Sequence, residues 1–217
     1  MVVKLDGPRA QPVSGGAPNS LVVLLHGVGA DGDDLIGLAP YLAPLLPDAE
    51  FLAPNGPFPC DMAPFGRQWF SLQDRDPAVL GAGVAATAPI LDAFLDDALK
   101  ARNLDGSRLA LVGFSQGTMM ALHVGPRRAV APAGIVGFSG ALLAPERLAV
   151  QTRSRPKTLL IHGDADPVVP FAALAIAERV LRLNHFPVET LVRPGLGHSI
   201  DDAGLHRAGE FLKGVLG

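Results

Sequence analysis

The sequence is poor in cysteine and in charge. Its 217 residues include a single cysteine, Cys60, so neither an intrachain disulfide nor a cysteine-based zinc site can form. One cysteine also fits a reducing cytoplasm. Lys and Arg total 18 against 21 Asp and Glu, a net charge of −3, and the charges are scattered. The chain thus lacks the basic stripe with which nucleic-acid-binding proteins displace counterions, and we expect no nucleic-acid partner.

Long hydrophobic runs are missing as well. No apolar run approaches the ~20 residues needed to cross a bilayer, so we expect no membrane span. Residues 1–6 lack the apolar core of a signal peptide, and Gly7-Pro8 directly after them would interrupt such a core. The hydrophobic fraction of 48% is ordinary for a globular protein and argues against disorder. The sequence therefore predicts a soluble cytoplasmic protein.

Short apolar runs alternate with helical stretches along most of the chain. This alternation predicts an α/β fold, with a mainly parallel central sheet covered by helices on both faces. The length favours one domain over 1–217, in which 1–20 is a turn-rich lead-in. Predicted strands are Leu21–Leu25, Glu50–Ala53, Arg108–Gly113, Gly134–Phe138, Lys157–His162 and Val188–Val192. Predicted helices are Asp34–Leu46, Pro77–Arg102, Gln116–Val124, Phe171–Leu183 and Asp201–Leu216.

Polar and glycine residues gather where four of the predicted strands end, after Leu25, Val112, Ile161 and Val192. In open α/β sheets, ligands bind outside the carboxyl ends of the strands. The four clusters therefore predict one site at one edge of the sheet.

The cluster after Val112 reads Gly113-Phe114-Ser115-Gln116-Gly117, which matches the G-x-S-x-G nucleophile elbow. An abrupt strand-to-helix turn strains the central serine and leaves no room for flanking side chains. The two glycines let such a turn close, with the Ser115 hydroxyl above the sheet. Since a predicted strand precedes the motif and a predicted helix follows it, we interpret Ser115 as a nucleophile.

A serine nucleophile needs a histidine base, which in turn needs a carboxylate that fixes its tautomer. In α/β-hydrolases they follow in the order Ser, Asp or Glu, His. His198 is the predicted base, because it lies in a glycine-rich loop between a strand and the last helix. For the acid, Asp166 is favoured over Asp164, although spacing alone leaves both open. Structural or solvated roles are expected for the remaining histidines downstream of Ser115, and a helix-start role for two acids: His123, His162, His185, His206, Asp201 and Asp202.

The glycine-rich segment after Leu25 has two interpretations. Attack on an ester creates an oxyanion, for which the backbone N–H groups of Gln116 and Val28 are the predicted donors. The segment also spells Gly27-x-Gly29-x-x-Gly32, with Glu50 about 20 residues on, as in a dinucleotide-binding fingerprint. However, Glu50 stands at the start of the second predicted strand, whereas a ribose-binding acid lies at the far end of that strand. That alternative also leaves Ser115, Asp166 and His198 without a role.

With these motifs the chain resembles the phospholipase/carboxylesterase family of α/β-hydrolases, which includes bacterial carboxylesterases and acyl-protein thioesterases. The resemblance spans about residues 21–200 and rests on these segments: Leu25 to Gly29, Asp33-Asp34, Phe51 to Pro54, Arg67 to Phe70, Gly113 to Gly117, Ser139-Gly140, His162 to Val169 and Gly197-His198. Many relatives carry Leu or Met after His-Gly, where this chain has Val28. Only a backbone N–H is needed there, so the difference touches the pocket rim and not the chemistry.

The resemblance implies the same triad and oxyanion donors, and it adds support for Asp166 over Asp164. It further suggests that Trp69, Phe70, Leu72 and Leu142 line the acyl site, although ordinary core packing explains them equally well. The implied activity is a serine carboxylesterase for short to medium acyl esters, with an acyl-protein thioesterase or lysophospholipase as the alternative. A non-catalytic ligand-binding relative is the remote alternative. The expected partner is a small ester or thioester, with no metal or organic cofactor, and a homodimer is left open.

Overall fold

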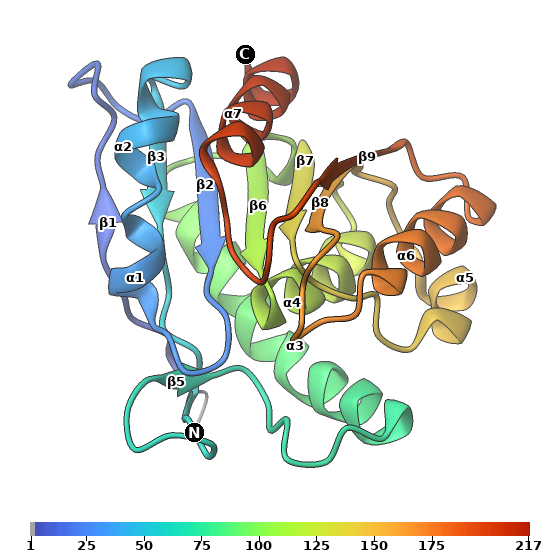
Figure 1. Cartoon of the computed structure of the whole chain (residues 1–217). Coiled ribbons are helices and arrows are strands. Elements are labelled where there is room, and N and C mark those ends of the chain that lie inside the picture. The colour runs from blue at the N-terminus through green and yellow to red at the C-terminus, as the bar shows by residue number, and fades with distance from the viewer. Residues whose placement is uncertain (1–2) are drawn as a thin grey trace.

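The central sheet of the computed structural model, which describes residues 3–217, has seven strands (Figure 1). Their order is β1-β3-β2-β6-β7-β8-β9, and neighbours pair in parallel except β1, which is antiparallel to β3. A separate hairpin joins β4 to β5. The bounds are β1 Arg9–Ala10, β2 Ser20–Leu25, β3 Ala49–Leu52, β4 Phe58–Pro59, β5 Arg67–Gln68, β6 Leu109–Phe114, β7 Gly134–Phe138, β8 Lys157–Gly163 and β9 Val188–Arg193.

Helices cover both faces of this sheet (Figure 1). The α-helices are α1 Gly32–Ile36, α2 Ala39–Leu42, α3 Pro77–Lys100, α4 Gln116–Val124, α5 Leu148–Gln151, α6 Ala172–Leu183 and α7 Asp202–Leu216. Short 3₁₀ turns occupy η1 Ala43–Leu45, η2 Gly106–Arg108, η3 Gly125–Arg127 and η4 Pro145–Arg147. The predicted α/β class with a mainly parallel sheet is therefore confirmed.

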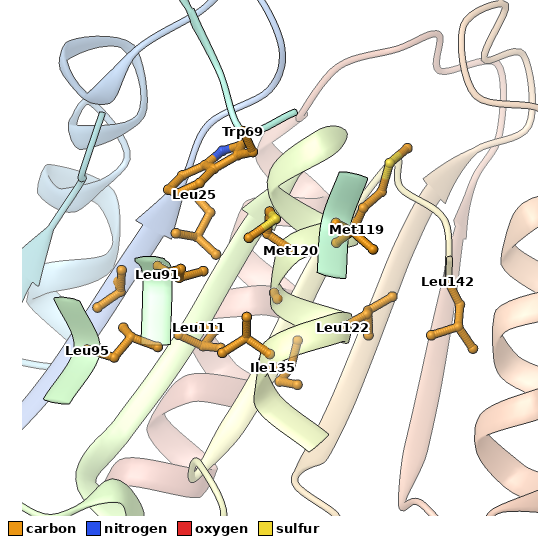
Figure 2. Close-up of a cluster of buried hydrophobic side chains, with 14 of the residues drawn as sticks. Leu25, Trp69, Leu91, Leu95, Leu111, Met119, Met120, Leu122, Ile135 and Leu142 are labelled. Atoms are coloured by element: carbon orange, nitrogen blue, oxygen red, sulfur yellow. The ribbon is translucent and has the colours of Figure 1, made fainter. Parts of the chain in front are cut away.

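Two hydrophobic cores follow from the alternation of side chains along each strand. In β2, Leu21, Val23 and Leu25 face the core shared with α3, α4 and α6, whereas Val22 and Leu24 face the core shared with α1, α2 and α7. Figure 2 shows part of the first core, where the Trp69 indole lies beside Leu25. Because both faces are buried, the strands read as unbroken apolar runs.

The predicted helix over Asp34–Leu46 is wrong as a single element. The chain forms α1, α2 and η1 there instead. Gly37 ends α1, and Pro40 and Pro44 each stand in the first turn of the next element. Proline lacks the N–H that a continuing helix needs but suits a helix start. The predicted turn-rich lead-in likewise contains a short strand, β1.

Helix α3 is long and apolar enough to cross a membrane by length and composition alone. In this fold its stripe of Val84, Leu91 and Leu95 is fully buried against the first core. Asp92 and Asp96, on the same helix, bind the guanidinium of Arg128. These contacts make α3 a core helix of the sheet.

Glu50, the acid that a dinucleotide site would have used, lies in a buried ion pair. Its carboxylate accepts hydrogen bonds from Arg102 Nε at 2.7 Å and Nη2 at 2.6 Å. Its side chain is only 4% exposed and that of Arg102 13%. The carboxylate is thus occupied by a neighbour in the fold, which removes the main support for the dinucleotide interpretation.

Replacing Arg102 alone should destabilise the protein strongly, because Glu50 would be left buried without a positively charged partner and with only the 3.4 Å hydrogen bond from Gln11 Nε2. We expect Arg102→Met to lower the free energy of unfolding by about 3–5 kcal/mol in urea denaturation, and Glu50→Leu with Arg102→Met to restore most of it. As a control, Arg182→Met removes the exposed pair with Glu178 and should cost less than about 1 kcal/mol. An Arg102→Met change no larger than the control's would contradict this account.

Candidate active site

Parallel pairing brings the predicted site residues to one edge of the sheet. Ser115 directly follows β6, Asp166 follows β8, and His198 follows β9. The loop that carries Val28 follows β2, the neighbour of β6 on its other side. Residues more than 80 positions apart in the sequence therefore share one edge, as predicted from the four polar clusters.

Ser115 occupies the strained backbone conformation that an elbow requires. Its φ is 53° and its ψ is −115°, a region that costs a non-glycine residue about 1–3 kcal/mol. Contacts on both sides hold the turn: Ser115 N–H donates to Phe138 O at 2.9 Å, and Thr118 Oγ1 lies 2.8 Å from both Gly113 O and Phe138 O. The strain is thus supported by β7.

The glycines of the elbow are required by close packing. A Cβ on Gly117 would lie 1.8 Å from Leu25 O, and a Cβ on Gly113 would lie 2.4 Å from Thr118 N. Both contacts are with backbone atoms, which cannot move away without disrupting β2 or α4. The predicted reason for the two glycines therefore agrees with the geometry, and α4 begins directly against the end of β2.

Asp166 holds His198, and Asp164 does not. Asp166 Oδ2 lies 2.7 Å from His198 Nδ1, and Asp166 Oδ1 accepts from the N–H groups of Val168 and Val169 at 2.8 and 3.0 Å. Burial raises the pKa of Asp166, but the hydrogen bonds from His198 and the two N–H groups outweigh it and hold that pKa below its ordinary value. Asp164 Oδ1 instead accepts from Gly195 N–H at 2.6 Å, which ties down the loop that leads to His198.

The loop that carries His198 crosses close over β8 at Gly163. A Cβ at this position would lie 2.1 Å from Leu196 O and 2.7 Å from Gly197 O. Ala165 N–H donates to Leu196 O at 3.1 Å, which fastens the crossing. The loop can therefore return from β9 toward β6 only because residue 163 has no side chain.

His198 also packs against the residue before the predicted nucleophile. Its ring centroid lies 4.8 Å from that of Phe114, with the planes tilted by 43°. Among residues 3–217, no hydrogen bond joins Ser115 Oγ to His198, while Nδ1 is taken by Asp166. Catalytic hydrogen bonds are often long before substrate binds. The imidazole thus lies beside the elbow, with Nε2 as its remaining polar atom.

His162 has a position that sequence reasoning described only as support for the loop. Its side chain is buried, and Nε2 lies 3.1 Å from Val169 O and 3.3 Å from Asp166 Oδ2. It therefore contacts the same carboxylate oxygen, Asp166 Oδ2, that His198 contacts. The only sequence signal was its place at the end of a strand, next to Gly163, and that signal names no partner.

The other histidines and acids considered in the sequence analysis lie away from the Asp166–His198 pair. His123 is buried in α4, where burial and the charges of Arg127 and Arg147 lower its pKa to about 4. His206 is exposed on α7 beside Glu210, and His185 lies in the turn before β9. Asp201 caps α7 through Gly204 N–H and binds Arg193, and Asp202 lies in the first turn of α7.

One predicted oxyanion donor, Gln116, lies within the elbow, and the other, Val28, follows a residue that packs against it. Gln116 begins α4, and Gly27, just before Val28, lies against the nucleophile: a Cβ on Gly27 would be 3.3 Å from Ser115 Cβ. In the described part of the chain, no backbone carbonyl accepts from the N–H of Val28 or of Gln116. The N–H groups are thus free to serve a ligand, and their role as an oxyanion hole stays a prediction.

The four residues suggested for the acyl site are mostly buried. Trp69 is 0% exposed, Phe70 3% and Leu142 8%, while Leu72 is partly buried against the same core. Trp69 therefore has no accessible surface with which to line a pocket, and it lies within the first core (Figure 2). A cavity of about 690 Å³ lies elsewhere, between the N-terminal segment, the end of β3 and α3, and none of the predicted site residues lines it.

The Gln116 side chain connects these buried residues to the elbow. Its Oε1 accepts from Trp69 N–H at 2.9 Å, and its Nε2 donates to Phe70 O at 2.7 Å. Sequence reasoning used only the backbone of Gln116, because its side-chain partners lie 46 and 47 residues earlier in the chain.

Comparison with known proteins places this geometry in a family. Residues 13–216 match the sequence profile described as Phospholipase/Carboxylesterase. Esterase YpfH of Escherichia coli is 30% identical over 89% of this chain and 82% of its own length. Acyl-protein thioesterase 1 of Mycosarcoma maydis is 28% identical over 94% and 95%. The crystal structure of esterase PE8 superposes with a TM-score of 0.94 at 43% identity, covering 99% of this chain and 100% of that one. The chain therefore belongs to the phospholipase/carboxylesterase family of α/β-hydrolases.

Proposed function

We propose that this protein is a serine carboxylesterase that hydrolyses short to medium acyl esters through an acyl-enzyme on Ser115. The observation that carries the proposal is the Asp166–His198 hydrogen bond of 2.7 Å beside a serine in a strained elbow. The esterases among the relatives support the same reaction class. We further propose that the site works within a single domain of a soluble, cytoplasmic enzyme.

In the proposed reaction His198 moves the protons and Ser115 forms the covalent bond. Nδ1 faces Asp166, so Nε2 accepts the Ser115 Oγ proton as Oγ attacks the acyl carbonyl. The ionised Asp166 stabilises the imidazolium that forms. Collapse of the oxyanion breaks the bond to the alcohol, which leaves with the proton from Nε2. Water then repeats the sequence on the acyl-enzyme, frees the acid and restores Ser115.

The charge on the carbonyl oxygen is largest in the tetrahedral intermediate. The N–H groups of Val28 and Gln116 are the proposed donors to it, since Gln116 follows Ser115 in the elbow, Gly27 before Val28 packs against Ser115, and no backbone carbonyl competes for them in residues 3–217. Donors fixed in place before the reaction are worth more than water, because they need no reorganisation as the charge develops. We propose that Phe70, Leu72 and Leu142, with Trp69 behind them, border the acyl group.

A thioesterase acting on acylated proteins is the second candidate. The similarity to acyl-protein thioesterase 1 over 94% of the chain favours it, and the same triad would cleave either bond. The two substrate classes differ in leaving group and in acyl length, so they can be separated directly.

A labelling experiment tests the nucleophile. We expect a fluorophosphonate probe to modify Ser115, as located by peptide mass spectrometry, and p-nitrophenyl butyrate hydrolysis to fall in proportion to labelling. Ser115→Ala should abolish both signals while leaving the thermal midpoint of unfolding no lower, since alanine keeps the same backbone strain and Ser115 Oγ forms no hydrogen bond among residues 3–217. A label on another serine, or full activity in Ser115→Ala, would contradict the assignment.

Asp166 and Asp164 lie in the same loop, so the same substitution at each position tests which aspartate orients His198. Asp166→Asn should lower kcat by about 10⁴-fold, because the amide no longer holds the productive His198 tautomer. Asp164→Asn keeps an oxygen for Gly195 N–H and should retain kcat within about threefold. Steady-state kinetics on p-nitrophenyl butyrate measure both variants. Near wild-type kcat in Asp166→Asn, or an equal loss in Asp164→Asn, would overturn the choice of Asp166.

Acyl length distinguishes the two candidate functions. We expect kcat/KM to be highest for C2–C8 p-nitrophenyl esters and to be lower for palmitoyl thioesters of a peptide and for lysophosphatidylcholine. The reverse order would assign the protein to the thioesterase or lysophospholipase branch.

A further inference from the structure

We propose that His26 is a positioning residue that sets the direction of the oxyanion-binding N–H of Val28. This inference rests on the proposed function, since it concerns the donor to the oxyanion. Sequence reasoning treated His26 only as part of the glycine-rich segment. In the fold it is fully buried, and both of its ring nitrogens have backbone partners.

The partners of the His26 ring specify one tautomer. Gly56 N–H donates to Nε2 at 2.8 Å, so Nε2 must carry a lone pair. The ring proton is then on Nδ1, which lies 2.7 Å from Gly27 O and donates to it. Burial lowers the pKa of His26, and this outweighs the opposite effects of the Gly27 bond and of Asp31 and Asp34, while Arg67 adds to the lowering. The ring therefore stays neutral in this tautomer at neutral pH.

The carbonyl that accepts this bond belongs to the peptide unit of the Val28 N–H. A peptide unit is planar and trans, so its C=O and N–H point in opposite directions. Holding the Gly27 oxygen toward His26 thus fixes the Val28 N–H on the other side. Gly27 in turn lies beside the nucleophile, since a Cβ there would be 3.3 Å from Ser115 Cβ. A donor on the carbonyl also polarises the same unit and strengthens its N–H as a donor.

His26 also holds the segment of residues 56–69. Gly56 at its start donates to the ring Nε2, and Trp69 at its end donates from Nε1 to the backbone oxygen of His26 at 3.0 Å. A purely structural account would therefore assign His26 to holding residues 56–69, with no effect of its own on the reaction. The two roles use different ring nitrogens, which allows them to be separated.

Asparagine and glutamine each preserve one of the two bonds. In His26→Asn, the amide Nδ2 replaces Nδ1 and can still donate to Gly27 O, while the bond to Gly56 is lost. In His26→Gln, Oε1 lies near the former Nε2 and can still accept from Gly56 N–H, while the bond to Gly27 is lost. His26→Asn leaves the buried Gly56 N–H unpaired, whereas His26→Gln leaves Gly27 O with the bond from Ala30 N–H at 3.3 Å, so His26→Gln should lose no more stability than His26→Asn.

The inference predicts a difference in catalysis between these two variants. His26→Gln should lower kcat on p-nitrophenyl butyrate roughly 10–100-fold, less than the 10²–10³-fold for loss of a whole oxyanion donor, with KM within about twofold. His26→Asn should keep kcat within about threefold. A short alkyl trifluoromethyl ketone serves as a transition-state analogue: Ser115 Oγ adds to the ketone carbonyl carbon, the Oγ proton passes to His198, and the ketone oxygen becomes an oxyanion. Its inhibition constant should rise in His26→Gln by the same factor as kcat falls.

Equal losses of kcat in both variants, or an unchanged inhibition constant in His26→Gln, would leave His26 with a structural role only. Treatment of the wild-type protein with fluorophosphonate provides the separate check: if Ser115 does not react, the proposed function fails, whatever the role of His26.

Should both variants fail to fold, ¹⁵N NMR of histidine-labelled wild-type protein still tests the role of His26. We expect His26 to show a protonated Nδ1 whose proton signal shifts when Ser115 is phosphonylated, whereas a protonated Nε2 or an unmoved signal would overturn the inference.

Discussion

The site depends on the parallel register of five neighbouring strands. Phe114 of β6 pairs with Phe138 of β7, Phe138 with Ile161 of β8, and Ile161 with Leu191 of β9. Because these ladders end at nearly the same level, the segments that follow them emerge side by side. The Ser115 turn, the Asp166 loop and the His198 loop thus share one edge, and the Val28 loop joins it from β2. The two cores on either face hold that edge in place.

Close backbone packing then sets where α4 and the His198 loop lie relative to the sheet. Gly117 lets α4 meet the end of β2, and Gly163 lets the His198 loop cross β8. The polar side chains near the elbow are then tied to backbone groups: His162 to Val169, and Gln116 to Trp69 and Phe70. These buried hydrogen bonds hold the residues next to the proposed reacting groups, which favours a site formed before substrate arrives. That prior organisation is what electrostatic stabilisation of an oxyanion requires.

Sequence reasoning predicted the sheet, the elbow and His198 because each has a local signature: a buried apolar run, a G-x-S-x-G motif and a loop after a strand. The choice of Asp166 over Asp164 drew on the family resemblance, because their spacing alone left both open. It was wrong about the helix over 34–46, where apolar residues concealed the breaks at Gly37, Pro40 and Pro44. It could not find the bond from Gly56 to His26, since the two residues lie 30 positions apart and no periodicity describes the path of the chain between them. The complete burial of Trp69 was open for the same reason, because it depends on partners far away in the sequence.

The central claim is that Ser115, His198 and the N–H groups of Val28 and Gln116 act on one tetrahedral centre. A crystal structure of the protein phosphonylated by a fluorophosphonate tests it most directly. The account predicts the phosphorus on Ser115 Oγ, with the phosphonyl oxygen within about 3 Å of both backbone nitrogens and His198 Nε2 facing Oγ or the leaving-group position. A phosphonyl oxygen directed into solvent, or bound by other groups, would contradict it.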